Sequence, residues 1–406
     1  MTTLELPDSL SPVLDAVAAV SEPYDGVYLV GGSVRDILLG EPNFDVDVVV
    51  EGDAIGLANE LAKKLDGRVR AHRTFGTAVV LYGDDGRVDV VTARSESYYA
   101  PAVLPAVEPG TIDEDLHRRD FTINAMAVSL KGDAVGKLVD PFGGRADLEA
   151  GRIRILHDRS FVDDPTRILR AIRYEDRYGF RMDDDTARLA RECIATGHVG
   201  DLSGARLRDE LEALLSEGDV SHAIPRLADL GAEQEIHPHV VADEESVRLF
   251  DRLRELNRRY SLGIPAWRLG FEALGRRLPP AEIADWLDRL KIRRPDANHI
   301  ERAIVEGPRI ADDLSGTAAD VVAAAEPHDP DAPLFALALT DAPQLHEYFD
   351  RLRGVRLEIS GADLAALGLG ESPRVGEILG ELRRRKLNGE LDGRESELQA
   401  ARELIG

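Results

Sequence analysis

The chain is poor in the residues that cross-link small secreted proteins and in the apolar runs that cross membranes. Its 406 residues include one cysteine, Cys193, which excludes an internal disulfide and a zinc cluster built from cysteines. No apolar run approaches the roughly 18 residues needed to span a bilayer. The first residues lack the basic and apolar segments of a signal peptide. We therefore expect a protein of the reducing cytoplasm without membrane contacts.

Aromatic residues and net positive charge are also scarce. Aromatics make up 5% of the chain and all hydrophobic residues 43%, which predicts aliphatic cores rather than disorder. The formal net charge is −25, so the chain as a whole lacks the basic excess typical of nucleic-acid-binding proteins. Any such contact would depend on local basic clusters, because a polyanion responds to the field along its own path.

What is present divides into two regions of different pattern. Within residues 1–150, β-prone apolar runs alternate with turns and amphipathic segments, which predicts a compact α/β unit. From about residue 161 the strand signals fade, and apolar residues recur at helical spacing between glycine and proline breaks. We expect an α/β head followed by an all-helical remainder, because a chain of this length exceeds one ordinary core.

The strongest local signal is the segment VYLVGGSVRDILLGEPNFDVDVVV at residues 27–50. It reads as strand, glycine pair, short helix and strand, and it places Asp45 and Asp47 two apart, so that both carboxylates point to one face. Two such carboxylates are costly without a cation, and Mg²⁺ is the hard ion that suits them. Two Mg²⁺ ions about 4 Å apart can activate a hydroxyl and stabilise a pyrophosphate leaving group.

The residues between the two strands suit a triphosphate. Gly31 and Gly32 allow close approach of the backbone, the following helix points its N-terminus at the same place, and Arg35 can pair with phosphate. A D-x-D pair or a glycine pair alone is commonly just solvated surface, whereas the ordered combination indicates a site. The segment is neither a dinucleotide fingerprint nor a Walker A loop.

The segment resembles the first motif of the bacterial-type (class II) tRNA nucleotidyltransferases and poly(A) polymerases, members of the DNA polymerase β superfamily. Later motifs follow in the family's order: RRDFTINAMA at 118–127, DPFGGRADL at 140–148, DDPTRILRAIR at 163–173 and ARLRDEL at 205–211. The resemblance is dense over residues 27–215. It implies an α/β nucleotidyltransferase head with a mixed sheet of about five strands, followed by all-α neck, body and tail.

We accordingly predict a catalytic head at residues 1–150, a neck with a nucleotide-template helix at 151–215, a body at 216–340 and a tRNA-binding tail at 341–406. The resemblance implies addition of C, C and A to the 3′ end of tRNA from CTP and ATP, with release of pyrophosphate. Some family members add only CC, only the final A, or poly(A). The loop at 95–116, which the resemblance connects with this choice, is full-length here. CCA addition is thus the first expectation and A-only addition the second.

The motif RRDFTINA and the strand RVDVV supply further candidates. Arg119 can hold phosphate, while Asp120 and Asn124 can read ribose hydroxyls. An ordinary salt bridge between Arg118 and Asp120 is the alternative. Asp89 is either a third catalytic carboxylate near the metal ions or a simple strand-edge acid.

The helix expected at 163–173 bears on nucleotide choice. Asp164 and Arg167 are three apart, so an acceptor lies beside donors on one face. Cytosine and adenine present the complementary pair on their pairing edge, and a mismatched group would cost about 1–3 kcal/mol. A surface ion-pair stripe is the alternative. The resemblance implies a protein template for CTP and ATP, with these nucleotide-binding residues: Asp163, Asp164, Arg167, Arg170 and Arg173.

Two basic clusters are candidates for RNA contact. Residues 251–302 carry 12 Lys/Arg against 8 Asp/Glu, and the run RRRK is the second cluster. The residues we expect to grip acceptor-stem phosphates are Arg293, Arg294, Arg383, Arg384, Arg385 and Lys386. Solvated helix faces explain both clusters equally well.

Other classes of protein fit the sequence less well. The two His-Asp dipeptides lack evident partner ligands, so phosphatase activity is not expected. A non-enzymatic RNA-binding protein would show damaged carboxylates, yet Asp45 and Asp47 are present. A small-molecule nucleotidyltransferase would share the D-x-D head but would not need RRDFTINA or a long helical body.

Overall fold

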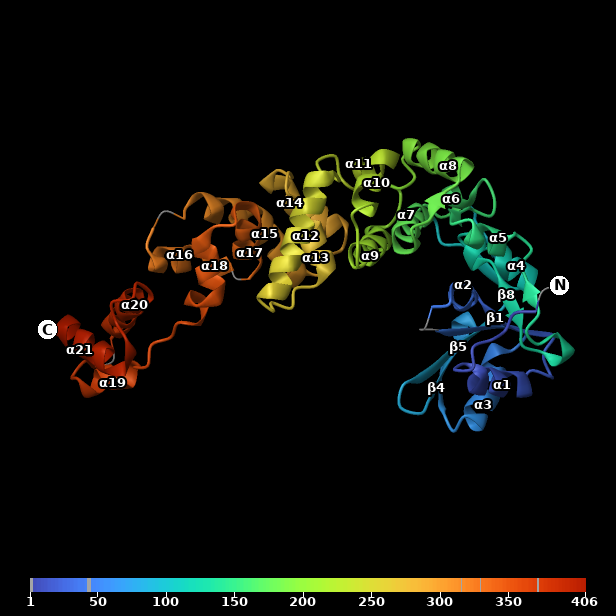
Figure 1. The fold of residues 1–406 in the computed structure, drawn as a ribbon, viewed down its shortest axis with the longest axis horizontal. Helices are drawn as coiled ribbons and strands as arrows, with labels where there is room; N and C mark the ends of the chain where they lie inside the picture. Colours follow the sequence, from blue (N-terminus) through green and yellow to red (C-terminus); the bar gives the residue numbers. More distant parts are fainter. Residues whose placement is uncertain (1–2, 42–44, 315, 329, 371) are drawn as a thin grey trace. The chain divides into compact units, whose positions relative to one another are not determined.

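A computed structural model of the chain describes residues 3–41, 45–314, 316–328, 330–370 and 372–406. The chain divides into two compact units: one contains Met1–Glu210 and Glu217–Ile236, and the other contains Leu211–Ser216 and His237–Gly406. Among the described residues, strands occur in the first unit and the second is helical (Figure 1). None of the helices in these ranges combines the length and the apolar character that crossing a bilayer requires.

The first unit is built on a mixed sheet of seven strands in the order β3-β4-β5-β2-β1-β8-β9. Strands β2 and β5 run parallel, and the other neighbours run antiparallel. The strands are β1 (Gly26–Val30), β2 (Val46–Glu51), β3 (Arg68–His72), β4 (Thr77–Tyr82), β5 (Gly86–Thr92), β8 (Ala127–Ser129) and β9 (Leu138–Val139). The α/β head followed by helices is therefore confirmed.

The sheet has two more strands than the roughly five expected, and both have weak sequence signals. The edge strand β3 is mostly exposed and carries the charged sequence RVRAH, so it lacks an apolar alternation. The strand β9 has only two residues. Both join the sheet through backbone hydrogen bonds to a neighbour, which side-chain patterns do not reveal.

Helix α3 packs on strands β2, β3, β4 and β5, and the core between the helix and the sheet is aliphatic as expected. Leu57 and Leu61 of α3 are fully buried, as are Val48 of β2 and Val90 of β5. The remaining elements of the head are α1 (Ser11–Ala19), α2 (Gly32–Leu39), α3 (Ala54–Lys64), α4 (Ile112–His117), α5 (Gly144–Glu149), the pair β6 (Arg94–Ser97) and β7 (Ala106–Pro109), and the 3₁₀ turns at Arg73–Phe75, Thr122–Asn124 and Gly132–Ala134.

Short helices continue the chain beyond the head. The helices are α6 (Ser160–Asp163), α7 (Thr166–Tyr178), α8 (Asp184–Ala195), α9 (Gly204–Leu215), α10 (Ala223–Leu230) and α11 (Ala232–Ile236), and a two-residue pair joins β10 (Arg152–Ile153) to β11 (Arg181–Met182). Helix α7 buries Ile168, Leu169 and Ile172 at helical spacing and ends at Gly179 in the left-handed region.

The helix that the sequence predicts at 163–173 is broken near its start. Asp164 is extended (φ −138°, ψ 93°) between α6 and α7, and Pro165 follows it. A residue before proline is disfavoured in the helical region, because the proline ring crowds its backbone. The template segment is therefore a bend followed by α7 rather than one continuous helix.

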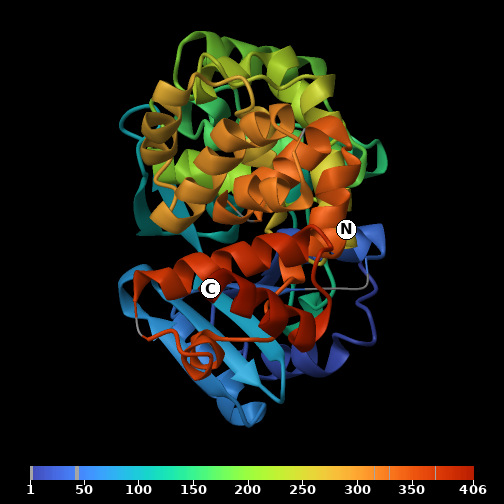
Figure 2. The ribbon, with the colours of Figure 1, turned by 90° about the vertical axis from the view of Figure 1, so that its left-hand side faces the viewer.

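The second unit is a stack of helices in which α15 and α17 pack along one another and α20 and α21 lie side by side (Figure 2). The helices are α12 (Glu244–Arg259), α13 (Ala266–Leu274), α14 (Pro280–Arg289), α15 (Arg294–Asp312), α16 (Ala318–Ala325), α17 (Asp331–Thr340), α18 (Pro343–Asp350), α19 (Gly361–Ala366), α20 (Pro373–Leu387) and α21 (Gly393–Ile405), with 3₁₀ turns at Glu326–His328 and Leu352–Gly354.

A buried glutamate, Glu272, makes the stability of the second unit depend on pH. Glu272 on α13 and Asp331 on α17 are fully buried, and Arg268 and His299 lie 2.9 and 2.8 Å from Asp331. Burial, and then the neighbouring charge of Asp331, raises the pKa of Glu272 well above its usual value. Ionised Glu272 therefore destabilises the folded unit at neutral pH.

We predict that Glu272→Gln raises the unfolding temperature at pH 8. A glutamate whose pKa is raised on folding contributes stability below its unfolded pKa of about 4.3 and loses it as pH rises toward the folded value. Glutamine mimics the protonated acid, so the gain over wild type should be larger at pH 8 than at pH 5 in calorimetric scans. Glu244→Gln, at an exposed position of α12, should follow wild type at both pH values. A lower unfolding temperature of Glu272→Gln at pH 8 would contradict this account.

Candidate nucleotide and metal site

Three carboxylates gather on two neighbouring central strands of the sheet, β2 and β5. Asp45 is exposed just before β2, Asp47 is the second residue of β2, and Asp47 pairs in register with Asp89 of the parallel strand β5. Residues in register on neighbouring parallel strands project to the same face of the sheet. Arg87 holds Asp89 through hydrogen bonds of 2.7 and 2.9 Å.

The electrostatics of this cluster favour a cation. Burial, the charge of Asp89 and the charge of Asp45 all raise the pKa of Asp47, while Arg119 opposes the shift. Arg87, which pairs with Asp89, also opposes the shift, yet the pKa of Asp47 remains raised. Carboxylate oxygens are the ligands that hard divalent cations prefer. The donor set therefore fits a divalent metal ion.

The glycine turn and Ser33 join helix α2 to these carboxylates. Gly31 is the N-cap of α2 at φ +67°, and a Cβ there would lie 2.3 Å from Nη1 of Arg119. The hydroxyl of Ser33 donates to the carbonyl oxygen of Asp45 and accepts from the amide of Asp47 at 3.2 Å. Ser33, which the sequence analysis did not single out, thus fixes the D-x-D backbone beside the helix N-terminus.

A cavity of about 410 Å³ adjoins this region and collects most of the expected nucleotide-binding residues. Helix α2, the RRDFTINA segment and α7 form its walls. Its lining residues are Gly32, Arg35, Glu96, Tyr98, Arg118, Arg119, Asp120, Asn124, Asp164, Arg167, Arg170 and Tyr174. The cavity is rich in arginine, as a site for a polyanionic ligand requires.

Asp120 organises one wall of the cavity. Its carboxylate accepts two hydrogen bonds from Arg170, at 3.0 and 2.7 Å, and one from the side chain of Asn124 at 2.9 Å. Asn124 in turn accepts a bond of 2.6 Å from Arg35. Burial alone would raise the pKa of Asp120, but Arg170, Asn124 and the Phe121 amide together lower it. The network therefore stabilises a charged Asp120.

Arg118 and Asp120 do not form the alternative salt bridge that the sequence analysis considered. Arg118 pairs with Asp115 at 2.7 Å and with Glu96 at 3.3 Å, and Arg119 also pairs with Asp115, at 2.9 Å. Asp115 is fully buried, and its carboxylate binds both arginines. The two guanidinium groups line the cavity with their positions already fixed.

Asp164 and Arg167 line the same cavity but do not bond to one another. Asp164 accepts from the hydroxyl of Thr166 at 2.6 Å and from Arg206 at 2.7 Å. Arg167 is buried and donates to Ser160 at 2.6 Å. The bend before α7 replaces the shared helix face expected from their spacing, yet it still brings both side chains to the cavity.

Three of the expected nucleotide-binding residues are not among those that line this cavity: Gly31, which precedes the lining residue Gly32, and Asp163 and Arg173. Asp163 lines an adjoining cavity of about 270 Å³, where Arg159 approaches it at 3.3 Å. Arg173 lies 3.9 Å from Glu210 of α9. The adjoining cavity shares four lining residues with the first: Glu96, Tyr98, Arg118 and Arg167.

Sequence reasoning assigned no role in the site to Glu96, Tyr98, Arg118 and Tyr174. Glu96 lies in the short strand β6 and Tyr98 directly follows it. This strand has no apolar alternation that would predict it. Tyr174 could have been found by its spacing of four from Arg170, whose Nη2 lies 3.1 Å from its hydroxyl. The guanidinium of Arg35 also lies 5.5 Å from the ring centre of Tyr174.

The six residues expected to contact RNA all lie in the second unit and differ in their pairing. Arg293 is the N-cap of α15 and Arg294 its first residue; both are exposed and pair with no acid among the described residues. The four residues of the RRRK run on α20 are all paired: Arg383 with Glu326, Arg384 and Arg385 with Glu381, and Lys386 with Glu397 and Glu358.

Taken together, the mixed sheet, the glycine turn, the carboxylate cluster and the arginine-lined cavity define a nucleotidyltransferase head. Residues 27–154 match the family described as Poly A polymerase head domain, and residues 179–244 match the family described as the probable RNA and SrmB-binding site of polymerase A.

An A-adding tRNA nucleotidyltransferase of Halalkalibacterium halodurans is 34% identical over 393 residues, which are 93% of this chain and 88% of that protein. Another from Geobacter sulfurreducens is 36% identical over 392 residues, and this chain spans 44% of its length. A solved CCA-adding enzyme in its apo form II is 31% identical with a TM-score of 0.86 over 98% of this chain and 99% of that one. The chain belongs to this family of tRNA nucleotidyltransferases, whose members generally depend on a divalent metal ion.

Proposed function

We propose that this chain transfers CMP and AMP from CTP and ATP to the 3′ end of tRNA and so builds the CCA terminus. The observation that carries the proposal is the placement of Asp47 and Asp89 in register beside an arginine-lined cavity. A solved relative at 29% identity and a TM-score of 0.82, the Thermotoga maritima CCA-adding enzyme complexed with tRNA, adds support.

A-only addition is the second candidate. The relatives from Halalkalibacterium halodurans and Geobacter sulfurreducens are both A-adding enzymes, and they are 34% and 36% identical over more than nine-tenths of this chain. The two candidates share the last step, which is transfer of AMP to a tRNA that ends in CC.

The carboxylates supply the metal site of the proposed reaction. Asp45 and Asp47 would hold two Mg²⁺ ions with Asp89 as a third acid beside them, because the oxygen-only donor set suits this ion. Bound Mg²⁺ would lower the barrier by activating the 3′-hydroxyl and neutralising charge on the pyrophosphate. The new bond joins the 3′-oxygen to the α-phosphorus, and the α–β phosphoanhydride bond breaks.

The nucleotide would lie against α2 and the RRDFTINA segment. Gly31 and Gly32 leave the backbone open at the helix N-terminus, where amide groups suit phosphate oxygens. Arg35 and Arg119 would neutralise the triphosphate. Asp120 differs from the sequence expectation, because both of its oxygens are engaged by protein donors; we assign it to positioning Arg170 and Asn124 rather than to reading ribose.

Base selection is assigned to Asp164 and Arg167. Their acceptor and donor groups line the cavity, and Arg206 and Ser160 fix their side chains. Groups fixed in this way reject a mismatched base because its polar edge would be left unpaired in the cavity. Asp163, at the adjoining cavity, and Arg173, which faces Glu210, would support this wall.

The tRNA contacts are assigned to the second unit, with Arg293 and Arg294 as the leading candidates. Positive charge at a helix N-terminus opposes the helix dipole, so two exposed arginines there are unfavourable unless an anion binds. The RRRK run of the predicted tail is the secondary candidate, because its members are already paired with acids.

The proposal is tested with three tRNAs that end at the discriminator base, at C and at CC. Each is incubated with the purified chain, Mg²⁺ and labelled CTP or ATP, and the products are resolved on a sequencing gel. Extension of the first tRNA to CCA supports CCA addition, and extension of the CC-ended tRNA alone by one A supports A-only addition. If the wild-type chain extended none of the three tRNAs, so that it could not be distinguished from an Asp45→Ala variant, nucleotide transfer would be overturned.

A further inference from the structure

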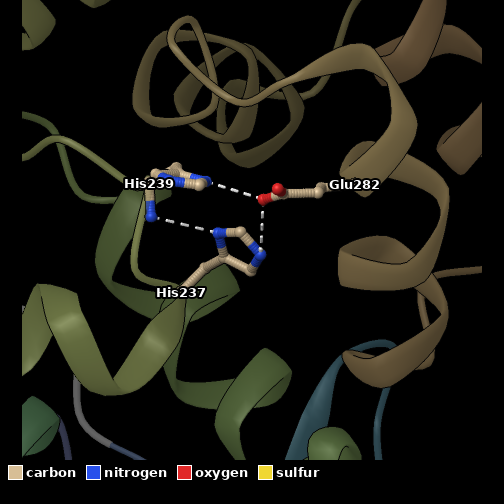
Figure 3. A group of neighbouring side chains, drawn as sticks. All are labelled: His237, His239 and Glu282. Carbon is tan, nitrogen blue, oxygen red and sulfur yellow. Dashed lines mark hydrogen bonds and ion pairs between the residues drawn. The ribbon is translucent and has the colours of Figure 1, made fainter.

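Two histidines and one glutamate form a cluster in the second unit (Figure 3). His237 and His239 lie in the His-Pro-His segment that follows α11, and Glu282 is the third residue of α14. Nδ1 of His239 lies 2.6 Å and Nε2 of His237 lies 3.6 Å from the same carboxylate oxygen of Glu282. One ligand atom from each residue lies within 4.8 Å of the other two.

These separations approach those of a metal site. Ligand atoms about 2.0–2.2 Å from a tetrahedral zinc ion lie about 3.3–3.5 Å from one another. The two nitrogen–oxygen distances of 2.6 and 3.6 Å bracket this value, so small side-chain rotations create the site. His239 and Glu282 are about half exposed and His237 is mostly buried, which leaves a fourth position open to water.

The inner ligand is held in place by its surroundings. The ring of His237 lies 6.5 Å from that of Trp286, and its Nδ1 accepts a hydrogen bond from the His239 amide at 3.2 Å, which directs Nε2 at Glu282. Metal at Nε2 would move the ring proton to Nδ1 and displace this amide bond. Arg289 adds positive charge near His237. Both effects favour moderate rather than very tight affinity.

We propose that His237, His239 and Glu282 bind one Zn²⁺ ion, with water as the fourth ligand. Two imidazole nitrogens and a carboxylate oxygen suit zinc, whereas the all-oxygen cluster around Asp47 suits Mg²⁺. The ion would tie the His-Pro-His segment to α14 and stabilise the second unit. This inference does not depend on nucleotide transfer.

The test is zinc binding to the whole chain after removal of metals with EDTA. Isothermal titration with ZnCl₂ should show one more zinc per wild-type chain than for His239→Ala. His198→Ala removes a histidine that pairs with Asp201 at 3.2 Å, and it should keep the wild-type stoichiometry. Zinc on the active-site carboxylates is common to all three proteins, so the difference isolates the cluster.

Two further measurements test the same site. Glu282→Gln should weaken the additional zinc by at least about tenfold, since even loss of an outer-shell partner costs that much. Co²⁺ should give the intense visible bands of a tetrahedral site in wild type and not in His239→Ala. Equal unfolding temperatures in EDTA establish that the variants fold. Identical zinc stoichiometry and cobalt spectra of wild type and His239→Ala would overturn the proposal and leave the cluster a surface ion pair.

Discussion

Replacing Asp47 with asparagine is expected to slow nucleotide transfer by orders of magnitude and at the same time make the protein more resistant to heat. The raised pKa of Asp47 means that its ionised form is disfavoured by folding. An acid with a raised folded pKa contributes stability below its unfolded pKa and loses it as pH rises, so charged Asp47 destabilises the chain at pH 7. Asparagine removes that charge but also removes a metal ligand.

The two consequences are measured separately. Single-turnover addition of AMP to CC-ended tRNA should fall by about a hundredfold to a thousandfold, the scale for losing one electrostatic contributor to a transition state. The unfolding temperature without divalent cation should rise, and addition of Mg²⁺ should stabilise wild type more than the variant.

Asp85→Asn is the matched control, because Asp85 is an exposed acid in the turn between β4 and β5. It should leave both activity and unfolding temperature unchanged. If Asp47→Asn kept most of its activity, or unfolded earlier than wild type in metal-free buffer, the charge cluster would not be the metal site described here.

Asp120→Ala is expected to have two effects: it should destabilise the first unit by about 3 kcal/mol, and it should remove nucleotide binding. Removing one partner of a buried ion pair leaves the other uncompensated, at about 3–5 kcal/mol, and the partial exposure of Arg170 places this pair at the lower end. Arg170 and Asn124 would lose their shared anchor, and Arg35 would lose the fixed position of Asn124.

The pH dependence of stability gives an independent reading. Asp120 has a lowered pKa in the fold. Its stabilising effect is therefore present above the unfolded pKa of about 3.9 and is lost as pH falls through the folded value. Wild type should lose this increment in acid, and Asp120→Ala should not show it, when urea unfolding is followed from pH 7 to pH 3.

The control is another aspartate paired with an arginine, but on the surface. Asp185 lies 3.2 Å from Arg188, and both side chains are exposed. Asp185→Ala should barely change the urea midpoint or the affinity for ATP, because exposed ion pairs contribute little. Equal effects of the two substitutions would contradict the organising role given to Asp120.

The sequence predicted those parts of the site that depend on local pattern. The order of strand, glycine pair, helix and D-x-D is set by periodicity and turn chemistry within residues 27–50, so Asp45, Asp47 and Gly31 could be placed together in advance. The division into an α/β head and a helical remainder follows from the same periodicities. In both cases the determining pattern is formed by residues that lie close together in the sequence.

The rest depends on partners far apart in the chain. The anchor of Asp120 is Arg170, 50 residues later, and no spacing rule connects them. The break at Asp164 could have been seen in Pro165, but the partner that then fixes Asp164, Arg206, lies 42 residues away. His237, His239 and Glu282 meet only because α14 folds back onto the His-Pro-His segment.

The pairing of the RRRK run with acids affects how many counterions tRNA binding would release at this run. A free arginine that meets a phosphate releases a condensed counterion from the RNA, and this release is what makes affinity fall steeply with ionic strength. Arg383 and Lys386 already have carboxylate partners, so meeting a phosphate would free Glu326 or Glu397 to recruit a cation of its own. Fewer ions would therefore be released at the RRRK run than at the unpaired Arg293 and Arg294, so the proposed contacts of α20 would add little to the salt dependence of tRNA affinity.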